Sequence, residues 1–192
     1  MDIKLILILV AIAVIAGILF MISRKKASVE ANETPETSET PSDNLYPFLG
    51  DLWEQDEETI QYHISNAIGK KSNSGEDLSK LNDYEKVFLV MDELEMEVNN
   101  GGFDQFFLNT DGRYNDILVS SAEAIKANDM AEICKKALAI YAEHAGEEDA
   151  IEELNECDEA FYASEDYITG LSVQYAKENK EQFKELVEKY VK

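Results

Sequence analysis

The sequence is poor in the residue types on which most metal sites, disulfide frameworks and catalytic centres depend. Its 192 residues include two histidines and two cysteines. His63 and His144 fall in different expected helices, without the His-Glu-x-x-His spacing or the cysteine pair that a zinc site needs. Cys134 and Cys157 occupy apolar positions of helical patterns, which favours reduced core residues over a disulfide. The sequence therefore predicts no metal, no cofactor and no catalytic residue.

Two glycine-containing segments lack the residues that would make them ligand-binding loops. Gly101-Gly102 has no further glycine, lysine and hydroxyl at the spacing of a phosphate-binding loop. Asn109-x-Asp111-Gly112 is similar to part of a calcium loop, but Leu118 stands where the bidentate glutamate is required. A carboxylate pair for acid–base chemistry has no specificity in a chain with 40 Asp and Glu residues. A hydrolase stays open only as an alternative without assigned residues.

Positive charge is also scarce. The chain has 17 Lys and Arg against 40 Asp and Glu, a formal net charge of −23. Residues 1–26 carry a net charge of +3, so residues 27–192 carry −26. Because affinity for phosphate backbones comes from Lys and Arg, direct binding to nucleic acid is disfavoured. Basic proteins become the expected partners.

The first 26 residues have the pattern of a membrane anchor. Residues 1–4 form a short tip, and residues 5–22 are free of charge and long enough to cross a bilayer as a helix. A cleaved signal peptide is the alternative, although its apolar region usually has about 7–15 residues. Arg24, Lys25 and Lys26 follow directly, and the positive-inside rule places the remainder in the cytoplasm. We expect a single-pass protein of the cell membrane.

A tether and one domain follow. Residues 23–44 combine the basic stop with a Glu-, Thr-, Ser- and Pro-rich segment that predicts a disordered acidic linker. Residues 45–192 show helical apolar spacing almost throughout and no sustained period-two alternation. The sequence predicts a compact all-α domain of about seven helices.

Individual helix boundaries follow from apolar stripes and capping residues. A first helix is expected over residues 45–68. A second is expected to begin at a capping box formed by Asn82 and Glu85. It is expected to end at Gly101-Gly102, where both glycines supply positive φ. Asp129 with Glu132 predicts the start of a later helix, and Ser164 predicts the cap of the one before the last.

Residues 97–112 contain a recognisable motif. Asn-Gly-Gly-Phe is followed by Gln, two aromatic residues and Asn, and the matching positions are Asn100, Gly101, Gly102, Phe103, Gln105, Phe106, Phe107 and Asn109. This segment resembles the signature of a bacterial family named after DNA-mimic proteins and catalogued for most members as a domain of unknown function. Residues 154–162 look like the acidic helix of the same family, which ends in an aromatic pair. The resemblance covers about residues 45–178 and implies an all-helical fold.

The motif has two interpretations. In the architectural one, the glycines reverse the chain, the phenylalanines fill the core, and Asn99, Asn100, Gln105 and Asn109 bond backbone groups in the turn. In the other, the same residues line a pocket for a ligand or partner. The anchor and tether lie outside the usual family domain, so a freely diffusing role does not transfer simply.

Acidic residues gather in a stretch without lysine or arginine. Between Lys136 and Lys177 there are eleven acids, and an interaction face is predicted at Glu148, Asp149, Glu152, Glu153, Glu156 and Glu159. Three like-charge i,i+4 pairs in this stretch are expected to destabilise a helix by about 1 kcal/mol in total, without local compensation.

The amount of charge is that of a DNA segment of the domain's size. A globule of about 148 residues is about 38 Å long, and a duplex of that length carries about 22 negative charges. Residues 45–192 carry a net charge of −21. Three hypotheses follow: a DNA-mimicking interaction module that binds a basic DNA-binding protein, a membrane-tethered structural or regulatory domain whose acidity serves solubility, and the unassigned hydrolase.

Overall fold

The computed structural model describes residues 46–144 and 151–191, and the elements in these ranges are all helical. The α-helices are α2 (Glu57–Ser72), α3 (Asp83–Thr110), α4 (Leu118–Ala124), α5 (Asn128–Glu143), α6 (Asn155–Ala163), α7 (Ile168–Glu178) and α8 (Lys180–Tyr190). Short 3₁₀ helices cover Leu52–Glu54, Leu78–Lys80 and Glu152–Leu154. For these residues the prediction of a compact all-α domain with about seven helices is confirmed.

The predicted anchor at residues 5–22 and the predicted linker at residues 23–44 lie outside the described residues. In the ranges that the structure does describe, none of the helices combines the length and the apolar character needed to cross a bilayer.

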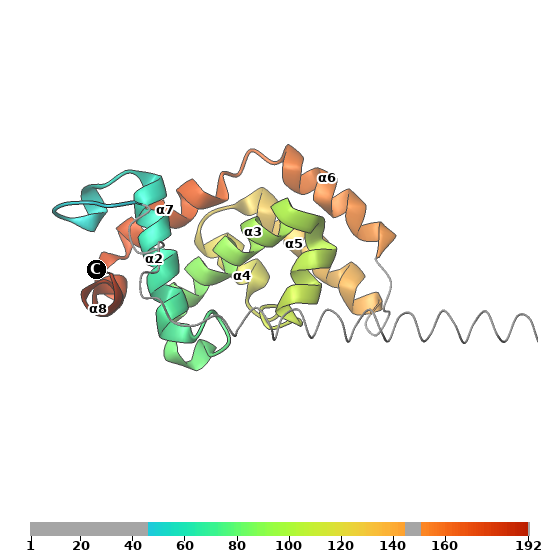
Figure 1. The fold of residues 1–192 in the computed structure, drawn as a ribbon. Helices are drawn as coiled ribbons and strands as arrows, with labels where there is room; N and C mark the ends of the chain where they lie inside the picture. The colour runs from blue at the N-terminus through green and yellow to red at the C-terminus, as the bar shows by residue number, and fades with distance from the viewer. Residues whose placement is uncertain (1–45, 145–150, 192) are drawn as a thin grey trace, which may run out of the picture. The chain divides into compact units, whose positions relative to one another are not determined.

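Helix α3 is the centre of the domain, and the other helices pack around its two halves (Figure 1). Around the first half lie α2, α7 and α8, where the Phe88 and Phe183 rings meet edge to face at 6.2 Å. Around the second half lie α4, α5 and α6, where the Phe107 ring stacks on Tyr141 at 4.2 Å. The apolar core therefore runs the length of α3 and holds both groups of helices on it.

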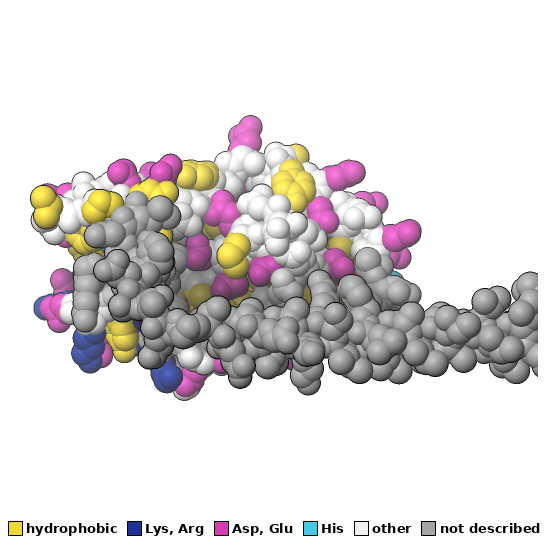
Figure 2. All heavy atoms as spheres, viewed as in Figure 1, with side chains coloured by type: hydrophobic (Ala, Val, Ile, Leu, Met, Phe, Trp, Pro, Cys, Tyr) yellow, Lys and Arg dark blue, Asp and Glu magenta, His cyan; other side chains and the backbone are white. Residues whose placement is uncertain are grey.

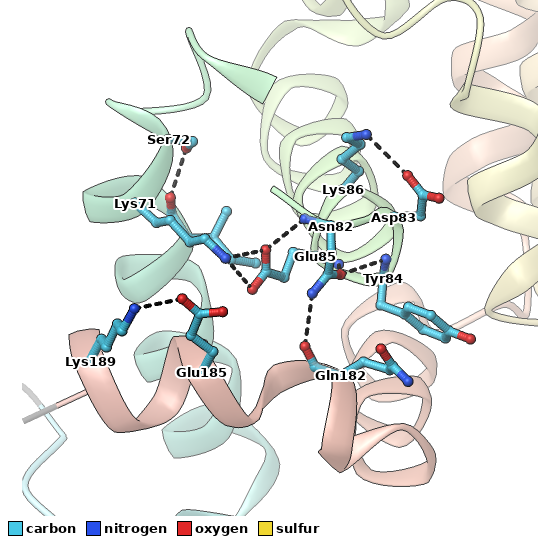
Figure 3. A network of polar contacts seen from close by, with 11 residues as sticks. Lys71, Ser72, Asn82, Asp83, Tyr84, Glu85, Lys86, Gln182, Glu185 and Lys189 are labelled. Carbon is cyan, nitrogen blue, oxygen red and sulfur yellow. Dashed lines mark hydrogen bonds and ion pairs between the residues drawn. The ribbon is translucent and has the colours of Figure 1, made fainter. Parts of the chain in front are cut away.

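The first half of α3 is fixed by a polar network at its start (Figure 3). The predicted capping box is confirmed: the Asn82 side chain accepts bonds from the N–H groups of Tyr84 and Glu85, and Glu85 Oε2 accepts the Asn82 N–H at 2.9 Å. Glu85 is fully buried, and the Lys71 ammonium of α2 lies 2.8 Å from both of its carboxylate oxygens. This ion pair joins α2 to the N-terminus of α3.

The first predicted helix starts later than expected. Residues 46–51 are not helical, and α2 begins at Glu57 instead of residue 45. The physical reason lies in three consecutive breaks: Gly50 has φ +93°, Asp51 caps a 3₁₀ turn, and Asp56 caps α2 by accepting the Thr59 N–H at 2.8 Å. The apolar spacing continues across these breaks because Phe48 and Leu52 pack on the same core as α2, whereas Leu49 is exposed.

Two predicted caps are also wrong. Asp129 lies inside α5, which begins at Asn128, and the Met130 N–H is instead bonded by the Asp166 carboxylate at 3.0 Å. Ser164 ends α6 and does not cap α7; its hydroxyl accepts the N–H of Asp166. A carboxylate distant in sequence thus performs the capping that local residues were expected to perform.

Cys134 and Cys157 are both buried and unbonded, as predicted. Burial raises the pKa of the Cys134 thiol to about 12, and the neighbouring Cys157 contributes to that increase. These groups behave as small apolar side chains of the α5–α6 contact.

Candidate functional site

The family-like motif forms a kink in α3. Gly101 and Gly102 are non-helical within the helix, but only Gly102 has a positive φ, of 78°; Gly101 is extended at −165°. The prediction that both glycines supply positive φ is therefore wrong for Gly101. A Cβ at Gly102 would overlap the carboxylate of Asp158, which belongs to α6. Gly102 is required both by its backbone conformation and by the close approach of α6.

The three phenylalanines of the motif are buried in the core. Phe103 meets the ring of Phe161 edge to face at 6.1 Å, Phe106 stacks on Tyr114, and Phe107 stacks on Tyr141. Each ring thus holds a different neighbouring segment against α3.

The polar residues of the motif bind a carboxylate and not the backbone. Gln105 Nε2 and Asn109 Nδ2 both donate to Glu97 Oε2 at 2.7 Å, across the kink. The expectation that these amides bond backbone groups is therefore wrong for Gln105 and Asn109. Asn99 and Asn100 are exposed at the kink. Glu97, which is half-buried, thus joins the two halves of α3.

The two sequence elements that carry the resemblance meet in space. Asp158 Oδ1 accepts the Phe103 N–H at 2.8 Å, and the Tyr162 hydroxyl donates to the Val98 carbonyl at 2.6 Å. Asp104 on α3 in turn accepts the N–H of Ile151 at 3.4 Å. The kink and α6 therefore form one packed unit.

The predicted acidic face is exposed where the structure describes it. Glu152, Glu153, Glu156 and Glu159 are exposed, whereas Glu148 and Asp149 lie outside the described residues. Glu156 forms an ion pair with Lys136 of α5 at 2.8 Å, which lowers the pKa of its carboxyl group. Glu153 lies 3.8 Å from His144. The expectation that these charges lack local compensation is therefore wrong for Glu156.

The repulsion expected between like-charged residues four positions apart does not apply to Glu152 and Glu156. Glu152 belongs to a 3₁₀ helix, whereas Glu156 lies in α6, so the two are not neighbours on one α-helical face. The other two pairs include Glu148 or Asp149, which lie outside the described residues. The penalty predicted from spacing is therefore wrong for the pair of Glu152 and Glu156.

A second group of carboxylates, on α3, was missed by the sequence analysis. Asp92, Glu93, Glu95 and Glu97 occupy four of six consecutive positions, and no lysine or arginine occurs between Lys86 and Arg113. The signal that reveals them is the absence of Lys and Arg over residues 87–112, a second stretch of the kind that contains α6. Glu95 accepts a bond from the Thr169 hydroxyl of α7, and α3 packs on both α6 and α7. The two lysine-free windows therefore lie against each other.

These α3 carboxylates sit in an unbalanced negative field. Burial raises the pKa of Asp92, Glu93 and Glu95 above their ordinary values. The charges of Asp92 and Glu97 raise that of Glu93 further, and Arg113 opposes them weakly. Carboxylates that repel one another in this way attract any cation brought to the surface.

One face of the molecule displays this asymmetry (Figure 2). Acidic side chains are spread over the whole visible face, both at the end that carries α6 and at the end that carries α8, whereas the Lys and Arg side chains visible among the described residues lie only toward the end that carries α8. Within the described ranges, no group of three or more His, Cys, Asp or Glu side chains is placed to hold a metal ion.

The sequence of this helical unit matches one known family, described as DMP19-like protein, over residues 79–192. The chain belongs to the DMP19-like protein family. The match confirms the predicted resemblance, but its bounds differ from the predicted 45–178: it begins at residue 79 and extends to residue 192. The DMP19-like region contains α3 to α8, and hence both the kink and α6. Comparisons with curated proteins and with solved structures gave no match.

Proposed function

We propose that this protein is a non-enzymatic, acidic interaction module that mimics the charge of duplex DNA and binds a basic DNA-binding protein. The observation that carries the proposal is the packing of α6 against α3, whose residues 87–110 contain no lysine or arginine, as α6 itself contains none. Mimicry needs charge gathered on one surface, and the proposal is supported by this packing because it brings two acidic segments together. The resemblance to a family named after DNA-mimic proteins supports the same function.

We further propose that residues 5–22 anchor the protein in the cell membrane and that the acidic domain faces the cytoplasm. The support is the uncharged run of residues and the basic cluster Arg24 to Lys26 that follows it. A reporter enzyme that works only in the cytoplasm should be active when it is fused after residue 192. Activity of a reporter that works only outside the cytoplasm, fused at the same position, would contradict the orientation.

A second candidate is a tethered structural or regulatory domain whose acidity serves only solubility. The observation in its favour is that several acids already have structural partners in the domain. Asp158 and Asp166 cap helices, and Glu156 pairs with Lys136. If such roles account for the acidic composition, exchanging exposed acids elsewhere should have the same effect as exchanging those on α6.

The deciding experiment captures partners from lysate with the tagged full chain in a mild detergent. Mimicry predicts a DNA-binding partner whose capture falls at least about tenfold between low and moderate salt and which duplex DNA displaces. The double variant Glu152→Gln, Glu159→Gln should weaken capture several-fold. The matched control Glu181→Gln, Glu188→Gln makes the same charge change on α8 and should not.

Two results would contradict mimicry. One is capture that is insensitive to salt and to competing DNA. The other is an equal loss in the two double variants, which would favour the solubility interpretation.

A further inference from the structure

An open cleft of about 540 Å³ lies where α2, α3 and the start of α7 meet. Its wall combines three tyrosines with two carboxylates, namely Tyr46, Tyr62, Tyr167, Glu58 and Asp92. The volume falls in the range of about 300–1,000 Å³ that is typical of small-ligand sites. Neither the motif nor the acidic face on α6 includes these residues.

The tyrosines present aromatic surface to this cleft. The Tyr46 and Tyr62 rings lie 5.1 Å apart, tilted by 50°. Tyr167, next to the N-terminus of α7, is 56% exposed although it carries a large aromatic ring. The faces of such rings carry negative electrostatic potential and attract cations, with Lys ammonium and Arg guanidinium as the usual partners.

One of the two carboxylates that line the cleft has a neutral hydrogen-bond partner. Asp92 Oδ1 accepts a bond from Gln61 Nε2 at 2.8 Å. Ion pairs in the described ranges neutralise Glu85 and Glu156 but do not involve Asp92 or Glu58. A partly buried carboxylate without a cation is unfavourable, and a bound cation would compensate it.

The cleft does not suit other classes of ligand. Anions are repelled by Asp92 and Glu58, and by Glu95, which lies one helical turn from Asp92. A metal ion needs several hard ligands together, and the described residues contain no such group at this place. Aromatic faces beside a carboxylate fit an organic cation best.

We infer that this cleft binds one alkylammonium or alkylguanidinium group, the head of a lysine or arginine side chain presented by a partner protein. Only the source of that side chain rests on the proposed function, because a basic DNA-binding protein offers many such groups. The cleft thus adds to a general electrostatic attraction a defined position for one cation.

The test uses blocked amino acids as probes of the side chain alone. N-acetyl-lysine methylamide and N-acetyl-arginine methylamide are titrated into the ¹⁵N-labelled full chain in detergent micelles, and amide chemical shifts are followed. We expect saturable shifts at Gln61, Asp92 and Thr169, with a dissociation constant of the order of 1 mM. N-acetyl-glutamine methylamide, which is neutral, should produce none.

Substitutions at two residues test the two recognition elements, the carboxylate and the aromatic ring. Asp92→Asn keeps an acceptor for Gln61 and should weaken binding of both cationic probes about tenfold. Tyr167→Leu should weaken it several-fold, whereas Tyr167→Phe, which keeps the ring face, should not. The control Glu188→Gln removes one exposed carboxylate outside the cleft and should leave binding unchanged. Retained chemical shifts in the remainder of the domain establish that each variant is folded.

Three outcomes would overturn the inference: shifts that do not saturate, an equal loss in Asp92→Asn and Glu188→Gln, or putrescine binding more than tenfold tighter than either blocked amino acid. The last would assign the cleft to free diamines. Partner capture is measured beside probe binding, for the unmodified chain and for Asp92→Asn. The two results together separate this inference from the proposed function. DNA-competed capture without probe binding refutes only the cleft, and probe binding without DNA-competed capture refutes only mimicry.

Discussion

Asp158 on α6 caps the part of α3 that follows the kink: its Oδ1 accepts the N–H of Phe103 at 2.8 Å. A helix that restarts after a break has unbonded N–H groups in its first turn, and a carboxylate is their best acceptor. Here the acceptor comes from a residue 55 positions later in the chain. Gly102 makes the approach possible, because any side chain there would occupy the position of the Asp158 carboxylate.

Replacing Gly102 by alanine should destabilise the domain by about 2–4 kcal/mol. The φ of 78° with ψ of −177° is a region that is essentially restricted to glycine, and the added Cβ would also displace Asp158. Urea unfolding followed by the fluorescence of Trp53, the single tryptophan, measures the change.

Gly69→Ala is the matched control for this prediction. Gly69 lies within α2, where a Cβ meets nothing within 4 Å, so alanine should leave stability unchanged or raise it by up to about 1 kcal/mol. If the two variants unfold at the same urea concentration, the kink does not depend on glycine.

Asp158→Ala should lower the free energy of unfolding by about 0.5–2 kcal/mol, the usual effect of losing a helix-capping acceptor. Asp158→Asn retains an acceptor oxygen and should lose less. Glu159→Ala changes the adjacent, exposed residue of the same helix and should shift stability by less than about 0.5 kcal/mol. A Glu159→Ala effect as large as that of Asp158→Ala would show that α6 responds to charge and not to the bond with Phe103.

The parts of this fold that sequence could predict are those set by neighbouring residues. The capping box of Asn82 and Glu85 spans three positions, and the amphipathic spacing of α2 to α8 repeats every turn, so both were readable. The start of α5 could not be predicted, because the N–H group of Met130 in its first turn is bonded by Asp166, 36 residues later in the chain. Capping by a distant carboxylate leaves no local signature.

Part of the candidate site could likewise be predicted from the sequence, and part of it could not. The lysine-free stretch containing Glu152 and Glu159 was visible in the sequence, and so was the shorter one from Asp92 to Glu97, once every window is compared. That these segments pack together was not visible, because it depends on contacts such as Tyr162 to Val98. Ion pairing of Glu156 by Lys136 was hidden for the same reason.

Lys71→Ala should destabilise the domain by about 3 kcal/mol or more. It leaves the carboxylate of Glu85 fully buried without its cation (Figure 3). The control is Lys86→Ala, which breaks the more exposed pair with Asp83 and should lower stability by less than about 1 kcal/mol. Urea midpoints of the two variants give the comparison, and similar losses would show that burial of Glu85 does not decide the strength of the pair.

Lowering the pH from 7 to about 5 should raise the stability of the domain. Burial raises the pKa values of Asp92, Glu93 and Glu95 in the folded state above the ordinary values of 3.8 and 4.5. The folded protein therefore binds more protons than the unfolded chain in this interval, and stability increases as pH falls through the raised pKa values. Below about pH 4 the opposite contribution follows, because Asp56, Glu156 and Glu185 have lowered pKa values and lose their favourable interactions when protonated.

This increase has to be separated from the general relief of repulsion in a chain with a net charge of −23. Urea midpoints at pH 7, 6 and 5 are therefore measured at high salt, which screens exposed charges much more than partly buried ones. Asp92→Asn removes the group that faces Gln61 and Ser65 of α2, so it should raise stability at pH 7 and reduce the pH dependence. Glu188→Gln, an exposed change of the same size, should alter neither. If high salt abolishes the pH dependence in the unmodified chain, exposed charge rather than burial on α3 is its origin.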